Sequence, residues 1–104
     1  MAESQRQQIT AVIYDRKGRV LSIGQNSYHK THPLQAAHAK KVGEPYKVFL
    51  HAEVHAIARC PDLTRAHRIL VSRWDKQGKA MLAAPCPICR SAIEAAGIRI
   101  VEHT

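Results

Sequence analysis

The chain has 104 residues, 45% of them hydrophobic, and 16 Lys and Arg against 8 Asp and Glu give a formal net charge of +8. This length predicts one compact domain, residues 1–104, with a single core. No apolar run approaches the roughly 20 residues that span a bilayer, and the polar start of the chain lacks the apolar stretch of a secretory signal. The composition therefore argues against a membrane or secreted protein. We expect a cytoplasmic protein in which residues 1–7 form a flexible N-terminus.

The excess of positive charge indicates an anionic partner, either a nucleotide or a nucleic acid. A basic surface that is merely solvated is the alternative. The cysteines have a separate meaning, because three is an odd number and two of them form the pair Cys86-x-x-Cys89. A cytosolic zinc site explains this pair better than a disulfide framework does. We expect the remaining cysteine, Cys60, to be a small buried apolar residue.

The first half of the chain predicts a β-hairpin followed by an irregular, basic segment. Residues 8–14 and 19–24 are rich in β-branched residues or alternate as strands do, and a turn at residues 15–18 joins them as an antiparallel pair. Residues 25–49 are the most basic and least regular part of the chain. A short helix over residues 34–41 interrupts this segment, which we expect to face the substrate.

The second half alternates helices with strands. Residues 50–60 and 87–96 predict helices, while residues 68–72 and 98–101 predict strands. The order β-β-α-β-α-β predicts an α/β sandwich of two or three layers. Its mixed central sheet would have helices crossing between neighbouring strands.

Two short motifs carry the chemistry: His51-Ala52-Glu53 and Pro85-Cys86-Pro87-Ile88-Cys89. One imidazole and two thiolates suit Zn²⁺, and three protein ligands leave the fourth tetrahedral position open, as in catalytic rather than structural sites. The combination H-x-E followed by P-C-x-x-C is the signature of zinc deaminases, in which the glutamate is not a ligand. We therefore predict that His51, Cys86 and Cys89 bind Zn²⁺ and that Glu53 is the catalytic proton shuttle.

Both motifs fall at the predicted start of a helix. Cys89 lies one turn beyond Cys86 on the same helix face, so two helices packed side by side can bring the three ligands together. The partial positive charge of the helix N-termini would favour the thiolates that zinc requires. The helices of the sandwich are thus expected to carry the zinc ligands.

Other interpretations of these residues remain open. Glu53 alone could be an acid favoured by the helix dipole. His55, four residues after His51, could complete a closed Cys2His2 structural zinc site, although we expect it to support the site or lie on the surface. Of the other histidines, some are candidates to contact phosphate and some are expected to be exposed: His29, His32 and His38 in the first group, His67 and His103 in the second.

From Ile9 to the C-terminus the sequence resembles the cytidine and deoxycytidylate deaminase superfamily, which also contains tRNA adenosine deaminases and polynucleotide cytidine deaminases. The resemblance is strongest in HAEVHAI at residues 51–57, in the P-C-x-x-C motif and in AAGIRIV at residues 95–101. The short deoxycytidylate-type and phage-type members are the most similar. The resemblance implies a cytidine deaminase-like fold and a zinc-dependent enzyme.

The resemblance also implies a mechanism and a set of substrate contacts. Water activated by zinc attacks C4 of cytosine, while Glu53 moves protons to the ring nitrogen and to the departing amine. The backbone N–H of Ala52 would hold the base carbonyl, and the carbonyl of Ala84 would accept from the exocyclic amine. Asn26 matches the asparagine that contacts the sugar, with a structural turn asparagine as the alternative.

The leading functional hypothesis is deamination of cytosine in a free nucleotide or nucleoside. Basic residues would hold the phosphate, and Arg73 and Trp74 could flank the base or its phosphate; Trp74 could equally be a packing residue. An alternative is deamination of cytosine or adenine in single-stranded DNA or RNA. A different class of function is a non-catalytic, zinc-stabilised module that binds nucleic acid.

The chain also departs from the family pattern. Family members usually continue into a further strand and helix, whereas this sequence stops three residues after its last predicted strand. A sheet that ends at residues 98–101 would have an exposed edge. We therefore expect a homo-oligomer that covers this edge or completes the site.

Overall fold

The computed structural model describes residues 8–104, so the predicted flexible segment 1–7 lies outside the described residues. The strands of its five-stranded sheet are β1 (Gln8–Tyr14), β2 (Val20–Gln25), β3 (Arg68–Trp74), β4 (Ala80–Met81) and β5 (Ile100–His103). The helices are α2 (Pro33–Lys41), α3 (Ala52–Arg59) and α4 (Pro87–Ala95), with a short 3₁₀ helix, η1 (Leu63–Arg65). No helix in this part of the chain is long and apolar enough to cross a membrane.

The sheet is mixed, as predicted. Strands β2, β1 and β3 lie side by side and are antiparallel, and β1 and β2 form the predicted hairpin. Beyond β3, the antiparallel β4 pairs with the end of β3 at Arg73 and Trp74, whereas the parallel β5 pairs with its beginning, from Arg68 to Val71. The described part of the fold is the α/β sandwich with a mixed sheet that the sequence predicted.

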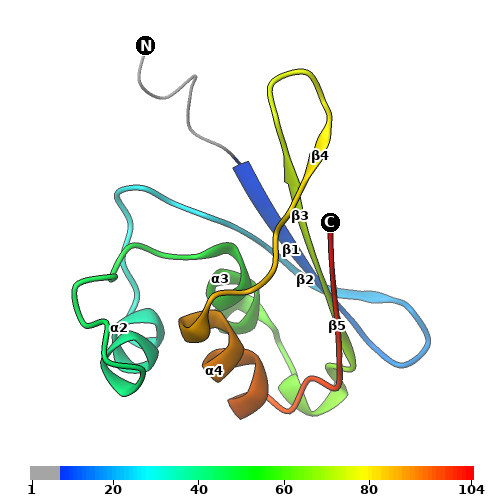
Figure 1. Ribbon diagram of the computed structural model, residues 1–104. Helices are drawn as coiled ribbons and strands as arrows, with labels where there is room; N and C mark the ends of the chain where they lie inside the picture. The colour runs from blue at the N-terminus through cyan, green and yellow to red at the C-terminus, as the bar shows by residue number, and fades with distance from the viewer. Residues whose placement is uncertain (1–7) are drawn as a thin grey trace.

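All three described helices lie on one face of the sheet (Figure 1). Of the two or three layers that the sequence allowed, the described residues therefore form two, one of helices and one of strands. Helix α3 packs directly on β1 and β2, α4 lies beside α3, and α2 contacts both of the other helices from outside. This packing places the starts of α3 and α4 next to each other. The zinc motifs belong to those two starts.

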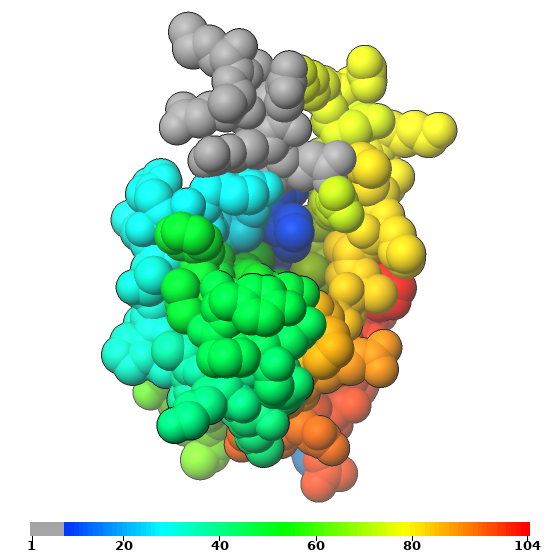
Figure 2. Space-filling view, turned by 60° about the vertical axis from the view of Figure 1, so that its left-hand side comes forward, coloured from blue at the N-terminus to red at the C-terminus, as the bar shows by residue number. Residues whose placement is uncertain are grey.

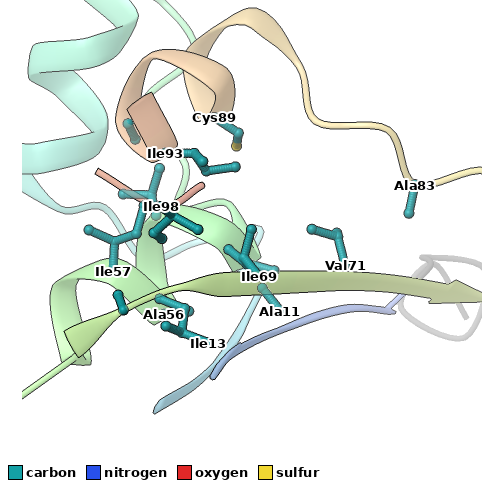
Figure 3. Packing of buried hydrophobic residues seen from close by; sticks show 14 of the residues in the cluster. Ala11, Ile13, Ala56, Ile57, Ile69, Val71, Ala83, Cys89, Ile93 and Ile98 are labelled. Atoms are coloured by element: carbon teal, nitrogen blue, oxygen red, sulfur yellow. The ribbon is translucent and has the colours of Figure 1, made fainter. Parts of the chain in front are cut away.

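The core lies between α3, α4 and this face of the sheet. Figure 3 shows Ile93 of α4 above Ile57 of α3 and Ile69 of β3, with Ile13 of β1 below them, and all four are buried. Alternate residues of β1 and β3 are buried, because successive side chains of a strand point to opposite faces. The period-2 pattern therefore fixes which face of each strand supports the helices.

The backbone of helix α3 packs directly against the backbone of β2 at Gly24. A Cβ atom on Gly24 would lie 2.3 Å from the backbone nitrogen of Ala56 and 2.4 Å from the carbonyl oxygen of Ala52, so only glycine fits. Two residues earlier, the hydroxyl of Ser22 donates to the carbonyl of Ala56 at 2.8 Å. This contact holds the first turns of α3 against the sheet.

Two strands in the second half of the chain differ from their predicted boundaries by two residues or more. The last strand, predicted at residues 98–101, begins at Ile100 because Ile98 is buried in the core and the backbone N–H groups of Arg99 and Ile100 donate to the carbonyl of His67. Strand β3, predicted to end at residue 72, continues to Trp74 and forms a short hairpin with the unpredicted β4. The first difference arises from pairing between segments that are distant in sequence, whereas the second involves a local hairpin closed by the turn at Asp75 and Lys79.

Candidate active site

His51 and Cys86 are the N-cap residues of α3 and α4. Each has an extended backbone, with φ −85° and ψ 155° for His51 and φ −72° and ψ 170° for Cys86, so each chain segment turns sharply into its helix. Pro87 occupies the first helical position of α4, where its fixed φ suits a helix and its missing N–H costs nothing. The predicted placement of both motifs at helix starts is confirmed.

The three predicted ligands meet at one point. The ligand atoms of His51, Cys86 and Cys89 all lie within 4.8 Å of one another. Nδ1 of His51 is 3.2 Å from Sγ of Cys89 and 3.4 Å from Sγ of Cys86. Tetrahedral zinc, with bonds of about 2.0–2.3 Å, separates its ligand atoms by about 3.5–3.8 Å. The two nitrogen–sulfur distances are therefore within a few tenths of an ångström of those around tetrahedral zinc, and the residues fit this ion.

The closed Cys2His2 alternative does not fit the structure. Nδ1 of His55 lies 3.0 Å from the backbone nitrogen and 3.1 Å from the carbonyl oxygen of Gln25, at the end of β2. Within residues 8–104, the cluster of potential metal ligands consists of His51, Cys86 and Cys89 alone. The described residues thus supply three ligands, and the fourth position of a tetrahedral ion is free for a ligand such as water.

The two sulfurs differ sharply in acidity. The hydrogen bond from Cys89, helped by the one with His51, lowers the pKa of the Cys86 thiol to about 3. The same bond to Cys86, together with burial, raises the pKa of Cys89. The hydrogen bond with Cys86 raises the pKa of His51. Cys86 is therefore already a thiolate, and metal binding must displace the proton held by Cys89.

Glu53 lies in the first turn of α3 and is 5% exposed. It lines the same pocket as His51 and Cys86 without belonging to the ligand cluster. Burial raises the pKa of its carboxyl group, while a hydrogen bond with Cys89 and the charge of His51 act in the opposite direction. A buried carboxyl whose pKa is shifted toward neutrality is suited to proton transfer.

A pocket of about 300 Å³ opens in front of these groups. Figure 2 shows the recess: the start of β1 lies between the residues after β2 on one side and the β4 segment on the other, with the segment before α3 below. Apolar side chains such as Ile9, Val71 and Leu82 form part of its walls, and Glu53 and Arg73 contribute charge. A mostly apolar pocket with few charged groups is typical of a small-molecule site.

Three of the four residues predicted to contact substrate lie in this pocket: Asn26, Ala52 and Ala84. The side-chain oxygen of Asn26 accepts a hydrogen bond from the backbone N–H of Ile9 at 2.8 Å, and its own backbone N–H donates to the carbonyl of Ile9 at 3.2 Å. These bonds fix the orientation of Asn26 at the pocket wall. Its contact with a sugar stays a prediction, as do the roles of Ala52 and Ala84.

Trp74 is not brought to the pocket. It is 50% exposed and follows Arg73 on β3, so strand alternation directs the two side chains to opposite faces of the sheet. Arg73 is the one that lines the pocket, and its Nη1 donates to the carbonyl of Leu82 at 3.5 Å. The buried Nε of Arg73 has no hydrogen-bond partner among the described residues. Arg73 is therefore the better candidate to hold a polar group of a ligand.

Sequence reasoning missed Gln35. This side chain of α2 is fully buried, accepts a hydrogen bond from the backbone N–H of His51 at 3.1 Å and donates to the carbonyl of Lys47 at 3.4 Å. It therefore positions the residue that begins the first metal motif. A single glutamine in a short helix gives no signal of this contact, because its partners lie 12 and 16 residues away.

The basic segment 25–49 reaches the pocket only through its two ends. Tyr28 and Phe49 line the pocket, and both are exposed at its mouth, with exposed fractions of 43% and 51%. The histidines between them serve the fold: His32 caps α2 by accepting from the N–H of Leu34, and His38 is hydrogen-bonded to Ser91 of α4 at 2.8 Å. His29 is exposed and does not line the pocket.

The comparisons with known proteins agree with this geometry. The family model of the cytidine and deoxycytidylate deaminase zinc-binding region matches residues 1–103. No curated protein matches the sequence significantly. The match covers both metal motifs and nearly the whole chain, and it identifies Zn²⁺ as the cofactor that His51, Cys86 and Cys89 are placed to hold.

Proposed function

The chain belongs to the cytidine and deoxycytidylate deaminase zinc-binding family, and from this membership we propose that it is an enzyme that hydrolyses the C4 amine of cytosine in a free nucleotide or nucleoside. The products would be the corresponding uracil compound and ammonia. The observation that carries the proposal is a three-ligand metal cluster with a separate buried carboxyl, Glu53, in one pocket.

When bound, zinc supplies the Lewis acidity that activates water as the nucleophile. Glu53 accepts the proton that the water loses and delivers it to the ring nitrogen N3. Glu53 then transfers the second water proton to the amine, so that ammonia leaves as the C4–N bond breaks. Burial raises the pKa of this carboxyl group, which favours its accepting a proton from the water before passing it on.

The pocket offers polar groups for the other edges of the substrate. Ala52 is the first residue of α3, so its backbone N–H is one of the donors that a helix leaves unsatisfied at its start. In our proposal this N–H binds the base carbonyl, the carbonyl of Ala84 accepts from the amine, and Asn26 contacts the sugar. Arg73 would bind the 5′-phosphate or another anionic oxygen through its fork of N–H donors.

The size of the pocket favours a small substrate, since about 300 Å³ lies at the lower end of small-molecule sites. One observation favours the second candidate, a base in single-stranded DNA or RNA. Tyr28 and Phe49 are exposed at the mouth of the pocket, where neighbouring bases of a strand could stack on them. A flipped base would then enter the pocket while its strand crosses the mouth.

A substrate panel tests these alternatives. Purified zinc-loaded protein is incubated with cytidine, deoxycytidine, their monophosphates, and oligonucleotides containing cytosine or adenine, and uracil, hypoxanthine and ammonia are measured. Conversion of the monomers supports the leading proposal. Conversion of oligonucleotides alone replaces it with the second candidate. No conversion of any compound favours the non-catalytic zinc module.

We also propose a cytoplasmic homo-oligomer. Among the described strands β5 pairs only with β3, and its Ile100 and Val101 are 41% and 43% exposed. A groove of about 460 Å³ lies beside it, with Ile93, Ile98 and Val101 in its lining. A second copy of the chain would cover this apolar groove and the open strand edge. Sedimentation of the zinc-loaded protein tests the state, and a monomer at all concentrations would contradict it.

A further inference from the structure

We propose that a second pocket, at the end of the sheet away from the metal centre, binds a multiply charged phosphate group. Three chain segments form it: the β1–β2 turn, the η1 loop and the connection from α4 to β5. In Figure 1 these segments lie at the end of the sheet opposite β4. The pocket measures about 450 Å³ and shares no lining residue with the pocket at the zinc ligands.

The pocket concentrates the positive charge of the chain. Its lining holds five arginine and lysine side chains against one carboxylate, Asp15, which is a formal charge of +4. The whole sequence carries +8, so half of the excess charge is gathered around one concavity. The five basic residues are Arg16, Lys17, Arg19, Arg65 and Arg99. Such a concentration in a pocket attracts anions more strongly than the same charges spread over a surface.

Asp15 organises this charge without cancelling it. Its side chain is 6% exposed, and it pairs with Nε of Arg19 at 2.8 Å and with Nη2 of Arg65 at 3.3 Å. It also accepts hydrogen bonds from the backbone N–H groups of Lys17 and Arg19, both at 2.9 Å. The carboxylate therefore holds two guanidinium groups and the turn in fixed positions. Within residues 8–104, no ion pair involves Arg16, Lys17 or Arg99.

Backbone hydrogen bonds hold the three segments together. The N–H of His67 donates to the carbonyl of Tyr14 at 2.9 Å, which ties the η1 loop to the end of β1. The carbonyl of His67 accepts from the N–H groups of Arg99 at 3.2 Å and Ile100 at 3.1 Å, which ties in the α4–β5 connection. The backbone of the pocket is therefore formed before any ligand binds, so little binding free energy is lost in ordering it.

The donor set indicates phosphate rather than a carboxylate. Four of the five cations are guanidinium groups, which bind the oxygens of phosphate in pairs through parallel N–H donors. A net charge of +4 is satisfied by a tri- or polyphosphate and not by a single carboxylate. The phosphate could belong to a nucleoside triphosphate or to the backbone of a nucleic acid, and the experiment below separates these two sources.

Tripolyphosphate is the first probe. Its binding to the zinc-loaded chain is measured by calorimetry at about 0.15 M salt, where long-range attraction is screened. The pocket variant is Arg16→Gln/Lys17→Gln/Arg99→Gln, which leaves the ion pairs of Asp15 in place. The matched control removes three exposed charges elsewhere: Lys40→Gln/Lys41→Gln/Lys79→Gln. We expect binding to weaken more than about tenfold in the pocket variant and less than about twofold in the control.

Equal weakening in both variants, or no binding to the unaltered chain, would overturn the proposal, because the charge would then act only as a diffuse field. Zinc content and melting temperature show that each variant is folded and that the metal centre is unaffected. The same comparison with a nucleoside triphosphate and with a single-stranded oligonucleotide identifies the source of the phosphate. The source of the phosphate is the ligand whose affinity falls in the pocket variant but not in the control. If neither ligand shows such a fall, the proposal is also overturned.

Discussion

The backbone N–H of His51 donates a hydrogen bond to the side-chain oxygen of Gln35 at 3.1 Å, and this bond ties α2 to the N-cap residue of α3. Because Gln35 also donates to the carbonyl of Lys47, it holds both ends of the segment that leads to the first zinc ligand. The position of the imidazole thus depends on a helix that contributes no ligand of its own.

Replacing Gln35 by leucine, Gln35→Leu, is expected to lower the free energy of unfolding by about 1–3 kcal/mol, because two backbone groups lose their partner. We also expect zinc affinity to fall by about 10–100-fold, as for other residues that orient a metal ligand. Zinc titration against a chelating indicator measures this. Gln77→Leu, in an exposed turn, is the control. Unchanged zinc affinity in Gln35→Leu would show that Gln35 does not position His51.

Adding one methyl group at Gly24 is predicted to displace α3. The Cβ of Gly24→Ala would lie 2.3 Å from the backbone nitrogen of Ala56, and backbone cannot move aside as a flexible side chain can. We expect a loss of about 1–3 kcal/mol in the free energy of unfolding together with weaker zinc binding. Urea denaturation and zinc titration measure the two effects.

The control for Gly24→Ala is its near neighbour Ser22→Ala, which removes one hydrogen bond to Ala56 without adding an atom. It should cost about 1 kcal/mol and leave zinc affinity intact. If both variants bind zinc equally, close contact between β2 and α3 does not set the ligand geometry.

Zinc is expected to stabilise the fold, because its ligands join the starts of two helices. Removal by a chelator should lower the melting temperature, and zinc at about 1,000 times its dissociation constant should restore about 4 kcal/mol. Rebinding should release protons at neutral pH, since Cys89 carries a proton in the metal-free site. A pH indicator in weakly buffered solution detects this release.

Cysteine variants identify the ligands behind this effect. Cys86→Ser or Cys89→Ser should abolish stoichiometric zinc binding, whereas Cys60→Ser should retain it, since Cys60 is not in the ligand cluster. Full zinc content in either ligand variant would contradict the assignment.

Acid stability is predicted to depend on Asp15. The backbone hydrogen bond from Arg19, with the ion pair to the same residue, lowers the pKa of this carboxyl below its usual value of 3.8. A lower pKa in the folded state means that the carboxylate stabilises the fold above the unfolded pKa, and that this stabilisation is lost as pH falls through the folded pKa. Asp15→Asn should therefore be less stable than the unaltered protein at pH 7.

The difference in unfolding free energy between Asp15→Asn and the unaltered protein should shrink as pH drops below about 4. Urea denaturation over a pH series measures it. Arg19→Gln, which removes the ion pair and keeps the backbone bond, should show a smaller effect of the same sign. A difference that stays constant with pH would mean that the Asp15 carboxylate adds no ionic stabilisation.

The zinc site could be predicted from sequence because its signal is local. Cys86 and Cys89 are three residues apart, His51 and Glu53 two apart, and each pair begins a helix whose N-terminal position the sequence also indicates. The strands at residues 8–14 and 68–72 could likewise be predicted from local composition. In each case, short spacing and backbone geometry determine the outcome.

What could not be predicted depends on contacts between distant segments. Gln35 meets His51 only after α2 has packed beside α3, and the last strand begins at Ile100 only because His67 supplies a carbonyl. The extension of β3 to Trp74 includes pairing of Arg73 and Trp74 with the distant β1, besides the local hairpin with β4. The basic turn at Asp15 became a pocket only when the η1 loop and Arg99 closed around it.

The most direct test of the central claim compares the unaltered chain with Glu53→Gln in zinc content, melting temperature and ammonia release from the best substrate of the panel. We expect about one zinc per chain and an undiminished melting temperature in both proteins, with turnover in Glu53→Gln lower by at least about 10²–10⁴-fold. Undiminished ammonia release by a zinc-loaded Glu53→Gln chain would contradict the account, since proton transfer would then not require this carboxyl group.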